Sequence, residues 1–316
     1  MNSTGNSAEN KPVIPVLTGP TASGKTSVVL RLLEEYPEID IISADSRQIY
    51  RHLAIGTDKP SPEILEKYNF HLVDFVEPGD RYTAFDFVDD SRRIIGKSLE
   101  KGQVPLICGG TGLYIKSLVE GIVEIPEDDL SFRKELEESA TAKGPKYLYE
   151  KLQKIDPKEA SKTHPNNIKR IIRALEIFLI TGRTKSDILY KNPENSDVYE
   201  YDIICLMPPR EELYRKINDR VDLMIKSGLL NEIDKLYKRD LKSRVEKVNV
   251  IGYNELFQHL DGELSLDEAV NLIKQNTRRF AKRQITWFRG MNNIRYLETP
   301  ESVFDYLKKH RGNKNN

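Results

Sequence analysis

Gly19-Pro20-Thr21-Ala22-Ser23-Gly24-Lys25-Thr26 fits the P-loop pattern G-x-x-x-x-G-K-[ST] at every fixed position. An apolar run at 13–17 precedes this stretch and predicts a strand, although Pro15 fits a central strand poorly. The apolar-periodic residues after it predict a helix. Loop N–H groups and the positive end of such a helix form a cradle for phosphate oxygens. Lys25 would add a positive charge there, and the Thr26 hydroxyl would face a Mg²⁺ ion held against the phosphates.

The length of 316 residues allows one large or two modest domains, and 38% hydrophobic residues suffice for a core. No apolar run approaches the roughly 20 residues that span a bilayer. The polar segment 1–11 lacks the apolar region of a signal peptide, so we expect a disordered leader and a cytoplasmic protein. Cys108 and Cys205 lie in apolar runs and are expected to be buried thiols. The absence of a long exposed apolar heptad pattern favours a monomer.

The net charge is zero, but the charges are distributed unevenly along the chain. Residues 1–129 carry 13 bases and 21 acids, whereas residues 130–195 carry 14 bases and 9 acids. The segment 269–297 contains seven bases and no acid. This distribution is compatible with a polyanion bound on one side of the molecule or with an ordinary solvated surface, and charge alone leaves both open.

Further strands are predicted at 39–42, 70–73 and 104–108, alternating with helices, one of which Thr83 caps. This alternation predicts an α/β fold, a P-loop parallel sheet flanked by helices. Asp45 follows one strand and Thr111 follows another. Because α/β sheets bind ligands beyond the carboxyl ends of their strands, both residues should lie near the P-loop.

From Gly121 the pattern becomes purely helical, after a break at 126–129. Helices are expected near 132–140, 147–154 and 167–180. The sequence therefore predicts an all-helical inserted domain at 121–200 within a core formed by 12–120 and 201–316. A strand at 201–206, after the polar stretch 191–200, returns the chain to the sheet.

Helices dominate again from Arg210, and a capping box at Ser265 opens a long one. Its expected apolar stripe is Val270, Ile273, Phe280 and Trp287, and core packing is the preferred prediction for Trp287 and Phe288. The remaining faces carry like charges four residues apart, which repel each other unless an anion lies between them. These pairs are Arg278 with Lys282 and Arg279 with Arg283.

In combination, these motifs resemble the tRNA dimethylallyltransferase family, whose members place an isopentenyl group on an adenosine beside the anticodon. The resemblance covers about residues 12–290, and only the P-loop is generic. The other matching motifs are Asp45-Ser46 with Gln48-Ile49-Tyr50, Ile55-Gly56-Thr57 with Lys59-Pro60, Gly109 to Tyr114, His164 to Asn167 with Arg170, Arg173 to Glu176, Gly182, Gly252-Tyr253, Thr277-Arg278, Ala281 to Gln284 and Thr286 to Arg289. The sequence shows no C-terminal Cys/His zinc finger, as expected for a bacterial-type member.

The resemblance implies that the P-loop, from Gly19 to Thr26, holds dimethylallyl diphosphate and not a nucleoside triphosphate to be hydrolysed. Adenine N6 is barely basic, so a carboxylate must take its proton, and Asp45 matches the family's acid. Thr111 would bond to the target nucleotide near the reacting amine. Lys25, Thr26 with Mg²⁺, and by resemblance Arg220, would stabilise the leaving diphosphate.

An adenine in an anticodon loop is stacked, so reaching its N6 requires flipping it into a pocket. The resemblance implies that the helical insertion grips the anticodon stem-loop of the tRNA, and no membrane partner is expected. The implied tRNA contacts are Asp45, Ser46, Arg47, Gln48, Thr111, Arg133, Lys169, Arg170, Ile171, Ile172, Arg173, Asn249, Val250, Ile251, Gly252, Tyr253 and Asn254.

Three alternatives remain open at this point. One is a P-loop kinase of a nucleoside or small metabolite, with residues 121–200 as its lid. Another is a non-catalytic RNA-binding protein with a P-loop fold. The third is an isopentenyltransferase acting on free adenine nucleotides, but those relatives are shorter around the insertion, so the long insert favours tRNA.

Overall fold

The computed structural model describes residues 11–122, 130–190 and 198–311. Three predicted features lie wholly or mostly outside these ranges. They are the leader at 1–11, of which only Lys11 is described, the break at 126–129, and the polar stretch 191–200, of which only 198–200 are described. The chain divides into two compact units, which we call the sheet unit (Met1–Glu120 with Val198–Asn316) and the helical unit (Gly121–Asp197). No helix among the described residues combines the length and apolarity needed to cross a membrane.

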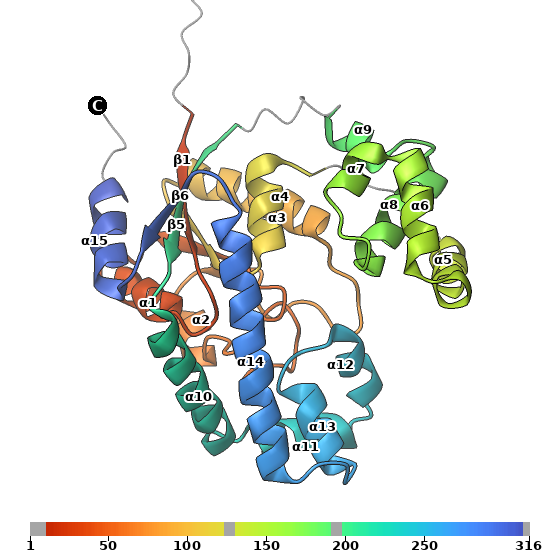
Figure 1. Cartoon of the computed structure of the whole chain (residues 1–316). Coiled ribbons are helices and arrows are strands. Elements are labelled where there is room, and N and C mark those ends of the chain that lie inside the picture. The colour runs from red at the N-terminus through yellow and green to blue at the C-terminus, as the bar shows by residue number, and fades with distance from the viewer. Residues whose placement is uncertain (1–10, 123–129, 191–197, 312–316) are drawn as a thin grey trace, which may run out of the picture. The chain divides into compact units, whose positions relative to one another are not determined.

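The sheet unit contains a six-stranded sheet whose pairings are all parallel, in the order β3-β2-β4-β1-β5-β6 (Figure 1). The predicted P-loop α/β fold is therefore confirmed. β6 was not predicted, and β3 is shorter than the predicted strand. The strands are β1 (Val13–Thr18), β2 (Ile39–Ser43), β3 (Phe70–His71), β4 (Val104–Gly109), β5 (Glu200–Leu206) and β6 (Ile294–Leu297).

Pro15 is tolerated in the central strand β1 because of the register of its two neighbours. β5 pairs with β1 over its whole length, placing Asp202 beside Pro15. On the other side, β4 pairs with β1 only from Val16 onward, so Pro15 has no pairing partner in β4. A residue without an N–H therefore sits where β1 has a partner strand on one side only.

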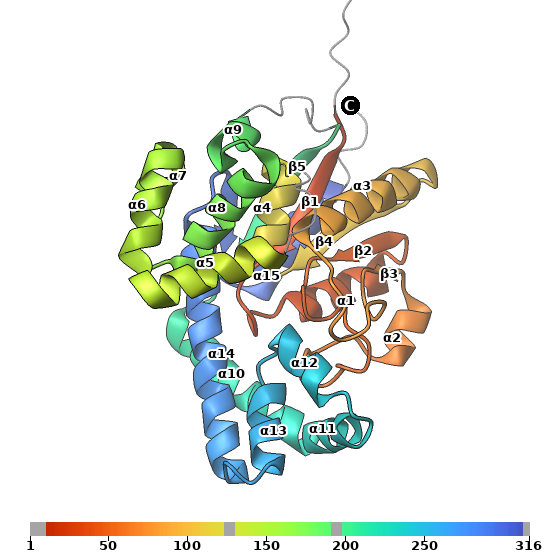
Figure 2. The same ribbon diagram turned by 90° about the vertical axis from the view of Figure 1, so that its right-hand side faces the viewer.

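Helices cover both faces of the sheet (Figures 1 and 2). α1 (Lys25–Glu35) and α15 (Pro300–Arg311) pack together on one face, and α3 (Ala84–Glu100) and α4 (Gly112–Glu120) lie on the other. The core of the first face joins Leu17 and Ile204 of the strands to Leu33 of α1 and Phe304 of α15. The predicted cap of α3 is confirmed, because Thr83 and Asp86 form a capping box. The short α2 (Pro62–Lys67) precedes β3.

Below the strands in Figures 1 and 2 lies a second, helical part of the sheet unit. It consists of α10 (Arg210–Lys226), α11 (Leu229–Lys238), α12 (Lys242–Val248), α13 (Tyr253–Leu260) and α14 (Leu266–Arg289). The core between these helices also includes Ile49 and Leu53 from the loop after β2. The capping box at Ser265 opens α14 as predicted.

The apolar stripe of α14 differs from the prediction. The buried row is Ala269, Ile273, Ala281, Gln284 and Phe288. Phe288 is fully buried, but its neighbour Trp287 is 42% exposed, so the predicted core packing of Trp287 is wrong. Successive helical residues point about 100° apart, so the two aromatic rings could not both face the same core.

The helical unit contains only helices among its described residues, in agreement with the predicted insertion. Its core includes Leu136, Leu152, Ile171 and Leu175. Its helices are α5 (Leu130–Lys143), α6 (Pro145–Ile155), α7 (Pro157–Ser161), α8 (Ile168–Thr181) and α9 (Lys185–Tyr190). The Asn167 side chain caps α8, which ends at Gly182.

Candidate active site

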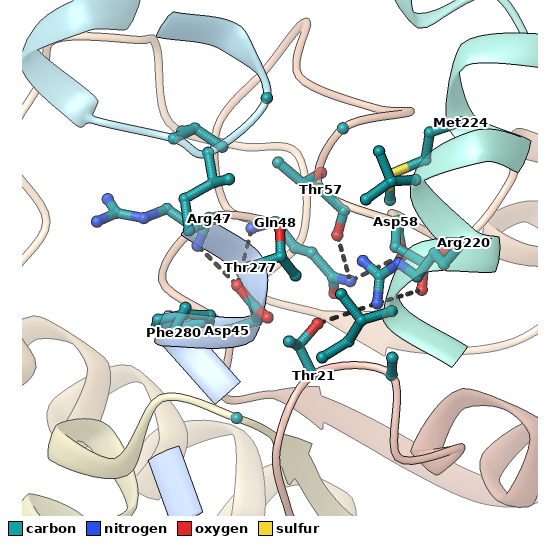
Figure 3. A pocket seen from close by; sticks show the side chains of 18 of the residues that line it. Thr21, Asp45, Arg47, Gln48, Thr57, Asp58, Arg220, Met224, Thr277 and Phe280 are labelled. Atoms are coloured by element: carbon teal, nitrogen blue, oxygen red, sulfur yellow. Dashed lines mark hydrogen bonds and ion pairs between the residues drawn. The ribbon is translucent and has the colours of Figure 1, made fainter. Parts of the chain in front are cut away.

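A cavity of about 520 Å³ lies in the sheet unit, beyond the carboxyl ends of the strands (Figure 3). Chain segments distant in sequence build its walls, including the P-loop, the turn after β2, the turn after β4 and the helices α10 and α14. The three residues predicted to be catalytic, Asp45, Thr111 and Arg220, all line it. The P-loop residues in its wall are Thr21, Ala22, Gly24, Lys25 and Thr26.

Lys25 folds back against the P-loop. Its Nζ donates hydrogen bonds to the carbonyl oxygens of Gly19 at 3.0 Å and Pro20 at 2.8 Å. Burial lowers the pKa of Lys25, and the nearby Asp45 carboxylate acts in the opposite direction. The ammonium group thus has only neutral hydrogen-bond partners and is poised to gain from an anion in the loop.

Asp45 has one oxygen engaged in the local backbone. Its Oδ1 accepts the N–H of Arg47 at 2.8 Å and the N–H of Gln48 at 3.4 Å, which fixes the turn after β2. Among the described residues, nothing donates to the other oxygen, Oδ2. The carboxylate is therefore held in place by one oxygen while the other is open to the cavity for a proton or a metal ion.

Thr111 connects its turn to the turn that carries Asp45. Its hydroxyl oxygen accepts the N–H of Ser46 at 2.9 Å, and its own N–H donates to the carbonyl of Ala44 at 3.1 Å. These bonds hold the ends of β2 and β4 together on either side of Asp45. The hydroxyl proton points to Ser46 Oγ at 3.2 Å and can turn to another acceptor.

Arg220 projects from α10 to the P-loop. Its Nη1 donates to Thr21 Oγ1 at 3.1 Å and lies 3.5 Å from a carboxylate oxygen of Asp58 (Figure 3). The guanidinium group carries five donors, so these two contacts leave donors for a further anion. The geometry puts a second positive group, after Lys25, beside the P-loop.

Gln284 of α14 was part of a matching motif, but sequence reasoning gave it no role. Its Oε1 accepts the N–H of Thr21 at 2.8 Å, and its Nε2 donates to the carbonyl of Gly110 at 2.8 Å. The side chain is 8% exposed. One buried amide therefore sets the spacing between the P-loop and the turn that carries Thr111.

Part of the cavity wall is apolar, which sequence reasoning also missed. Ile217, Val221 and Met224 come from successive turns of α10, and Ile273 and Phe280 come from α14. The spacing of the α10 residues is the only sequence signal for this wall. The cavity thus offers charged groups at one end and an apolar surface next to them, a combination suited to a small amphiphile.

The loop at 54–58 is anchored by Glu232 of α11, another residue not identified from the sequence. One carboxylate oxygen accepts the N–H groups of Ala54 and Ile55, at 3.2 and 3.0 Å, and the other accepts the hydroxyl of Tyr253 at 2.5 Å. A Cβ at Gly56 would lie 2.5 Å from the Tyr253 ring, so only glycine fits there. These contacts position Asp58 opposite Arg220.

The implied tRNA contacts fall into three groups. Asp45 to Gln48, Thr111 and Asn249 to Gly252 line the cavity. Tyr253 is fully buried, and Asn254 donates to Asn249 Oδ1 at 3.0 Å. The remaining positions belong to the helical unit and are Arg133, Lys169, Arg170, Ile171, Ile172 and Arg173.

Within the helical unit, the side chains of Ile171 and Ile172 are buried in the core, so only their backbone can face a ligand. Arg133 and Arg173 both pair with the fully buried Glu176, at 3.1 and 2.8 Å. Arg170 pairs with Glu159 at 2.8 Å. Lys169 is exposed and has no partner among the described residues.

The described residues contain no cluster of three or more His, Cys, Asp or Glu side chains able to hold a metal ion. The side-chain oxygens of the cavity near the P-loop include those of Thr26, which is exposed, and of Asp45. The two cysteines are free; Cys205 is buried as predicted, whereas Cys108 is only partly buried, so that prediction is wrong for Cys108. The low polarity around them raises the pKa of Cys108 to about 11 and that of Cys205 to about 12. Both thiols are therefore neutral near neutral pH and are not candidate nucleophiles.

Comparison with known proteins gives a consistent family. Residues 48–291 match the family model described as IPP transferase. A tRNA dimethylallyltransferase of Thermotoga maritima is 44% identical over 301 residues, covering 94% of this chain and 96% of the relative. One of Geobacter sulfurreducens is 40% identical over 303 residues, covering 96% of this chain and 97% of the relative.

Two solved structures show the same fold. The tRNA isopentenylpyrophosphate transferase of Bacillus halodurans has a TM-score of 0.66 and 36% identity, covering 95% of this chain and 96% of that one. A eukaryotic dimethylallyltransferase studied while acting on tRNA has a TM-score of 0.77 and 26% identity, covering 95% of this chain and 77% of that one.

Proposed function

Because the chain belongs to the IPP transferase family, we propose that its cavity joins dimethylallyl diphosphate, held by the P-loop, to a tRNA adenine presented to Asp45. As a member of this family the chain is an enzyme that transfers a dimethylallyl group to an adenosine of tRNA. The proposal concerns the residues that do this. The observation that carries it is the shared cavity of the P-loop, an open Asp45 oxygen and an apolar wall.

The diphosphate of the substrate would bind against the P-loop backbone, where Lys25 exchanges its contacts with two loop carbonyls for phosphate oxygens. Arg220, already bonded to Thr21, would meet the same group from the side of α10. The five-carbon tail would lie against Val221, Met224 and Phe280. Binding energy from both ends of this substrate would fix its reacting carbon in the cavity.

In the chemical step, N6 of the adenine forms a bond to the allylic carbon as the bond from that carbon to the diphosphate oxygen breaks. Asp45 takes one proton from N6 through its open oxygen, so the product nitrogen is neutral. The electron pair of the broken bond leaves on the diphosphate, where Lys25 and Arg220 offset the added negative charge. Thr111 would orient the adenine through its hydroxyl.

The Thr26 hydroxyl fits a Mg²⁺ ion that takes its other ligands from diphosphate and water, since Mg²⁺ commonly binds proteins through few side chains, and the open oxygen of Asp45 stays available for the N6 proton. When bound, the ion would offset negative charge on the leaving diphosphate. Thr26 supports this role because its side chain is exposed at the first turn of α1.

For the tRNA, we propose that the cavity-lining residues of 45–48 and 249–252 contact the flipped adenosine next to the anticodon. The exposed basic residues of α8, Lys169 above all, would contact backbone phosphates of the stem-loop. We also propose that the enzyme works as a monomer in the cytoplasm.

The test is incubation with radiolabelled dimethylallyl diphosphate and unmodified tRNA. We expect label on an adenosine next to the anticodon and release of diphosphate. Transfer of γ-phosphate from ATP to a small acceptor, with tRNA left unmodified, would contradict the proposal and favour a kinase. AMP added as a competing acceptor should not reduce tRNA labelling, and preferential labelling of AMP would favour an enzyme of free nucleotides.

A salt titration tests the two halves of substrate binding separately. Contacts to RNA phosphates release counterions, so affinity for tRNA should fall steeply with salt. Binding of dimethylallyl diphosphate, which meets few charges in a partly enclosed cavity, should change much less. A flat salt response for tRNA would contradict the proposed phosphate contacts.

A further inference from the structure

Trp287 is the only tryptophan of the chain, and its side chain is 42% exposed near the carboxyl end of α14. Its Nε1 donates no hydrogen bond to any of the described residues. Packing inside the protein therefore does not explain the exposed part of the ring or its unused N–H. Trp287 is thus a candidate for contact with a ligand.

The indole is nevertheless held firmly at one edge. A Cβ at Gly112 would lie 2.2 Å from Trp287 Cδ1 and 2.4 Å from Nε1, so the ring covers the backbone of a residue that must be glycine. Gly112 directly follows Thr111, which lines the cavity. The exposed ring is thus fixed one residue away from a hydroxyl proposed to orient the target adenine.

The same side of α14 connects this ring to the cavity. Phe280 and Arg283 both line the cavity, and the guanidinium of Arg283 lies 5.7 Å from the centre of the Phe280 ring. Trp287 follows Arg283 by four residues, so their side chains are neighbours on the helix surface. An aromatic ring, a guanidinium and a second aromatic ring therefore run from the cavity to the outside.

The surroundings of this row are positively charged. Arg279, Lys282, Arg283 and Arg289 lie on exposed positions of α14. Among the described residues, none of these four forms an ion pair with a carboxylate. Rings interleaved with unpaired basic side chains are the combination that binds single-stranded RNA, whose bases stack on the rings and whose phosphates meet the charges.

We infer that Trp287 is a stacking platform for an unpaired base adjacent to the target adenine in the tRNA loop. This inference rests on the proposed function, because it needs the target base to enter the cavity beside Thr111. Flipping one base removes a stacking partner from its neighbour. The indole would replace that partner, so part of the cost of extrusion is offset on the enzyme surface.

The single tryptophan allows a direct test by fluorescence. An unmodified anticodon stem-loop, added to the intact protein, should quench the emission of Trp287, whereas inorganic diphosphate should not. A stem-loop in which the two bases flanking the target are replaced by abasic sites should bind with less quenching. Unchanged emission at a saturating concentration of the intact stem-loop would overturn the inference.

Variants separate stacking from support of the fold. Trp287→Leu keeps an apolar cover on Gly112 but removes the ring, and it should raise the KM for the stem-loop by about 5- to 150-fold, the range for loss of one base–aromatic stack. Trp287→Phe should restore most of this loss. The KM for dimethylallyl diphosphate should stay unchanged in both variants.

Tyr237→Leu is a matched control, because Tyr237 is a 41% exposed aromatic residue of α11 that does not line the cavity. It should leave the KM for the stem-loop unchanged. A purely structural role of Trp287 would instead lower the unfolding temperature and raise the KM of both substrates, and that result would overturn the inference. If the wild-type protein transfers the dimethylallyl group but the stem-loop does not change Trp287 emission, only this inference is wrong. If the wild-type protein transfers nothing, the proposed function is wrong as well.

Discussion

In the cavity, Asp45 and Arg220 each keep hydrogen-bonding capacity for a ligand, whereas in the helical unit Arg170 and Arg173 are already paired with buried carboxylates. Both regions carry charges that the sequence marks as functional. In the cavity, Asp45 accepts backbone N–H groups and Arg220 contacts a neutral hydroxyl and a partly exposed carboxylate. In the helical unit, the arginines form ion pairs with buried carboxylates and so stabilise the fold. The difference teaches that a family motif identifies a basic residue but does not tell whether its charge is already used within the fold.

The largest effect should come from Asp45→Asn. Asparagine keeps the shape and can accept the Arg47 N–H, but it cannot take a proton from N6. We expect the rate of transfer to fall by about 10²- to 10⁴-fold, the usual contribution of a general base. Rapid-quench measurement of labelled tRNA gives this rate. Binding of tRNA in a gel-shift experiment should be retained, and a variant with near-normal transfer would show that the open carboxylate is not the base.

Gln284→Leu should have the next largest effect. It leaves the Thr21 N–H and the Gly110 carbonyl without their buried partner, at a cost of about 1–3 kcal/mol. If the P-loop shifts, kcat/KM for dimethylallyl diphosphate should fall by about 5- to 150-fold. Gln275→Leu, at an exposed position of the same helix, is the matched control and should change little. Equal effects of the two substitutions would remove the special role of Gln284.

The helical unit should lose stability in acid. Burial acts to raise the pKa of Glu159, but hydrogen bonds and charges of Arg170 and Lys185 outweigh it, so the pKa is lower than 4.5. Burial also acts to raise the pKa of Asp156, but hydrogen bonds from Ser186 and the Glu159 N–H outweigh it, so the pKa lies below 3.8. A carboxylate with a lowered folded pKa stabilises the fold above its unfolded pKa, and this contribution is lost as the pH falls through the folded value.

Hydrogen exchange resolved by unit should therefore show faster opening of the helical unit as the pH drops below 4.5, after correction for intrinsic rates. Glu159→Gln should lower stability by about 1–3 kcal/mol at neutral pH. It should also flatten the acid dependence. An unchanged acid dependence in this variant would mean that other groups control the transition.

The smallest effect should come from Lys169→Ala, the exposed and unpaired residue of α8. If it meets an RNA phosphate, tRNA affinity should fall a few-fold and the slope of log affinity against log salt should decrease by about one. The unfolding temperature should not change. Arg170→Ala is the contrasting variant, because it breaks the contact with Glu159 and should lower the unfolding temperature. If instead Lys169→Ala lowered the unfolding temperature and Arg170→Ala weakened only tRNA binding, then Arg170 would be the RNA contact and Lys169 the structural residue.

Local patterns were enough to predict the P-loop, the parallel sheet and most of the helices. The loop, its strand and its helix are adjacent in sequence. Thr83 and Ser265 mark the starts of their helices, because each forms a capping box within four consecutive residues. Asp45 and Thr111 could be assigned to one edge because parallel strands bring their carboxyl ends together.

The remaining features depend on contacts between distant residues. Gln284 bonds to Thr21 across 263 positions, and no local pattern signals such a pair. β6 is a short edge strand whose residues are only partly buried, so its apolar pattern is weak. The orientation of Trp287 was missed because two neighbouring aromatic residues look equally suited to a core until the helix fixes which one faces it.

The length of α14 has a mechanical consequence. At about 1.5 Å per residue, its 24 residues make a straight rod of about 36 Å. Near one end Ile273 is embedded among α11, α12 and α13, and toward the other end Gln284 is bonded to the P-loop. Separating the helices α11, α12 and α13 from the sheet as one block would therefore break the hydrogen bonds of Gln284 to Thr21 and Gly110. We expect motion during turnover to be concentrated in the short turns that connect these elements, where no such bond has to break.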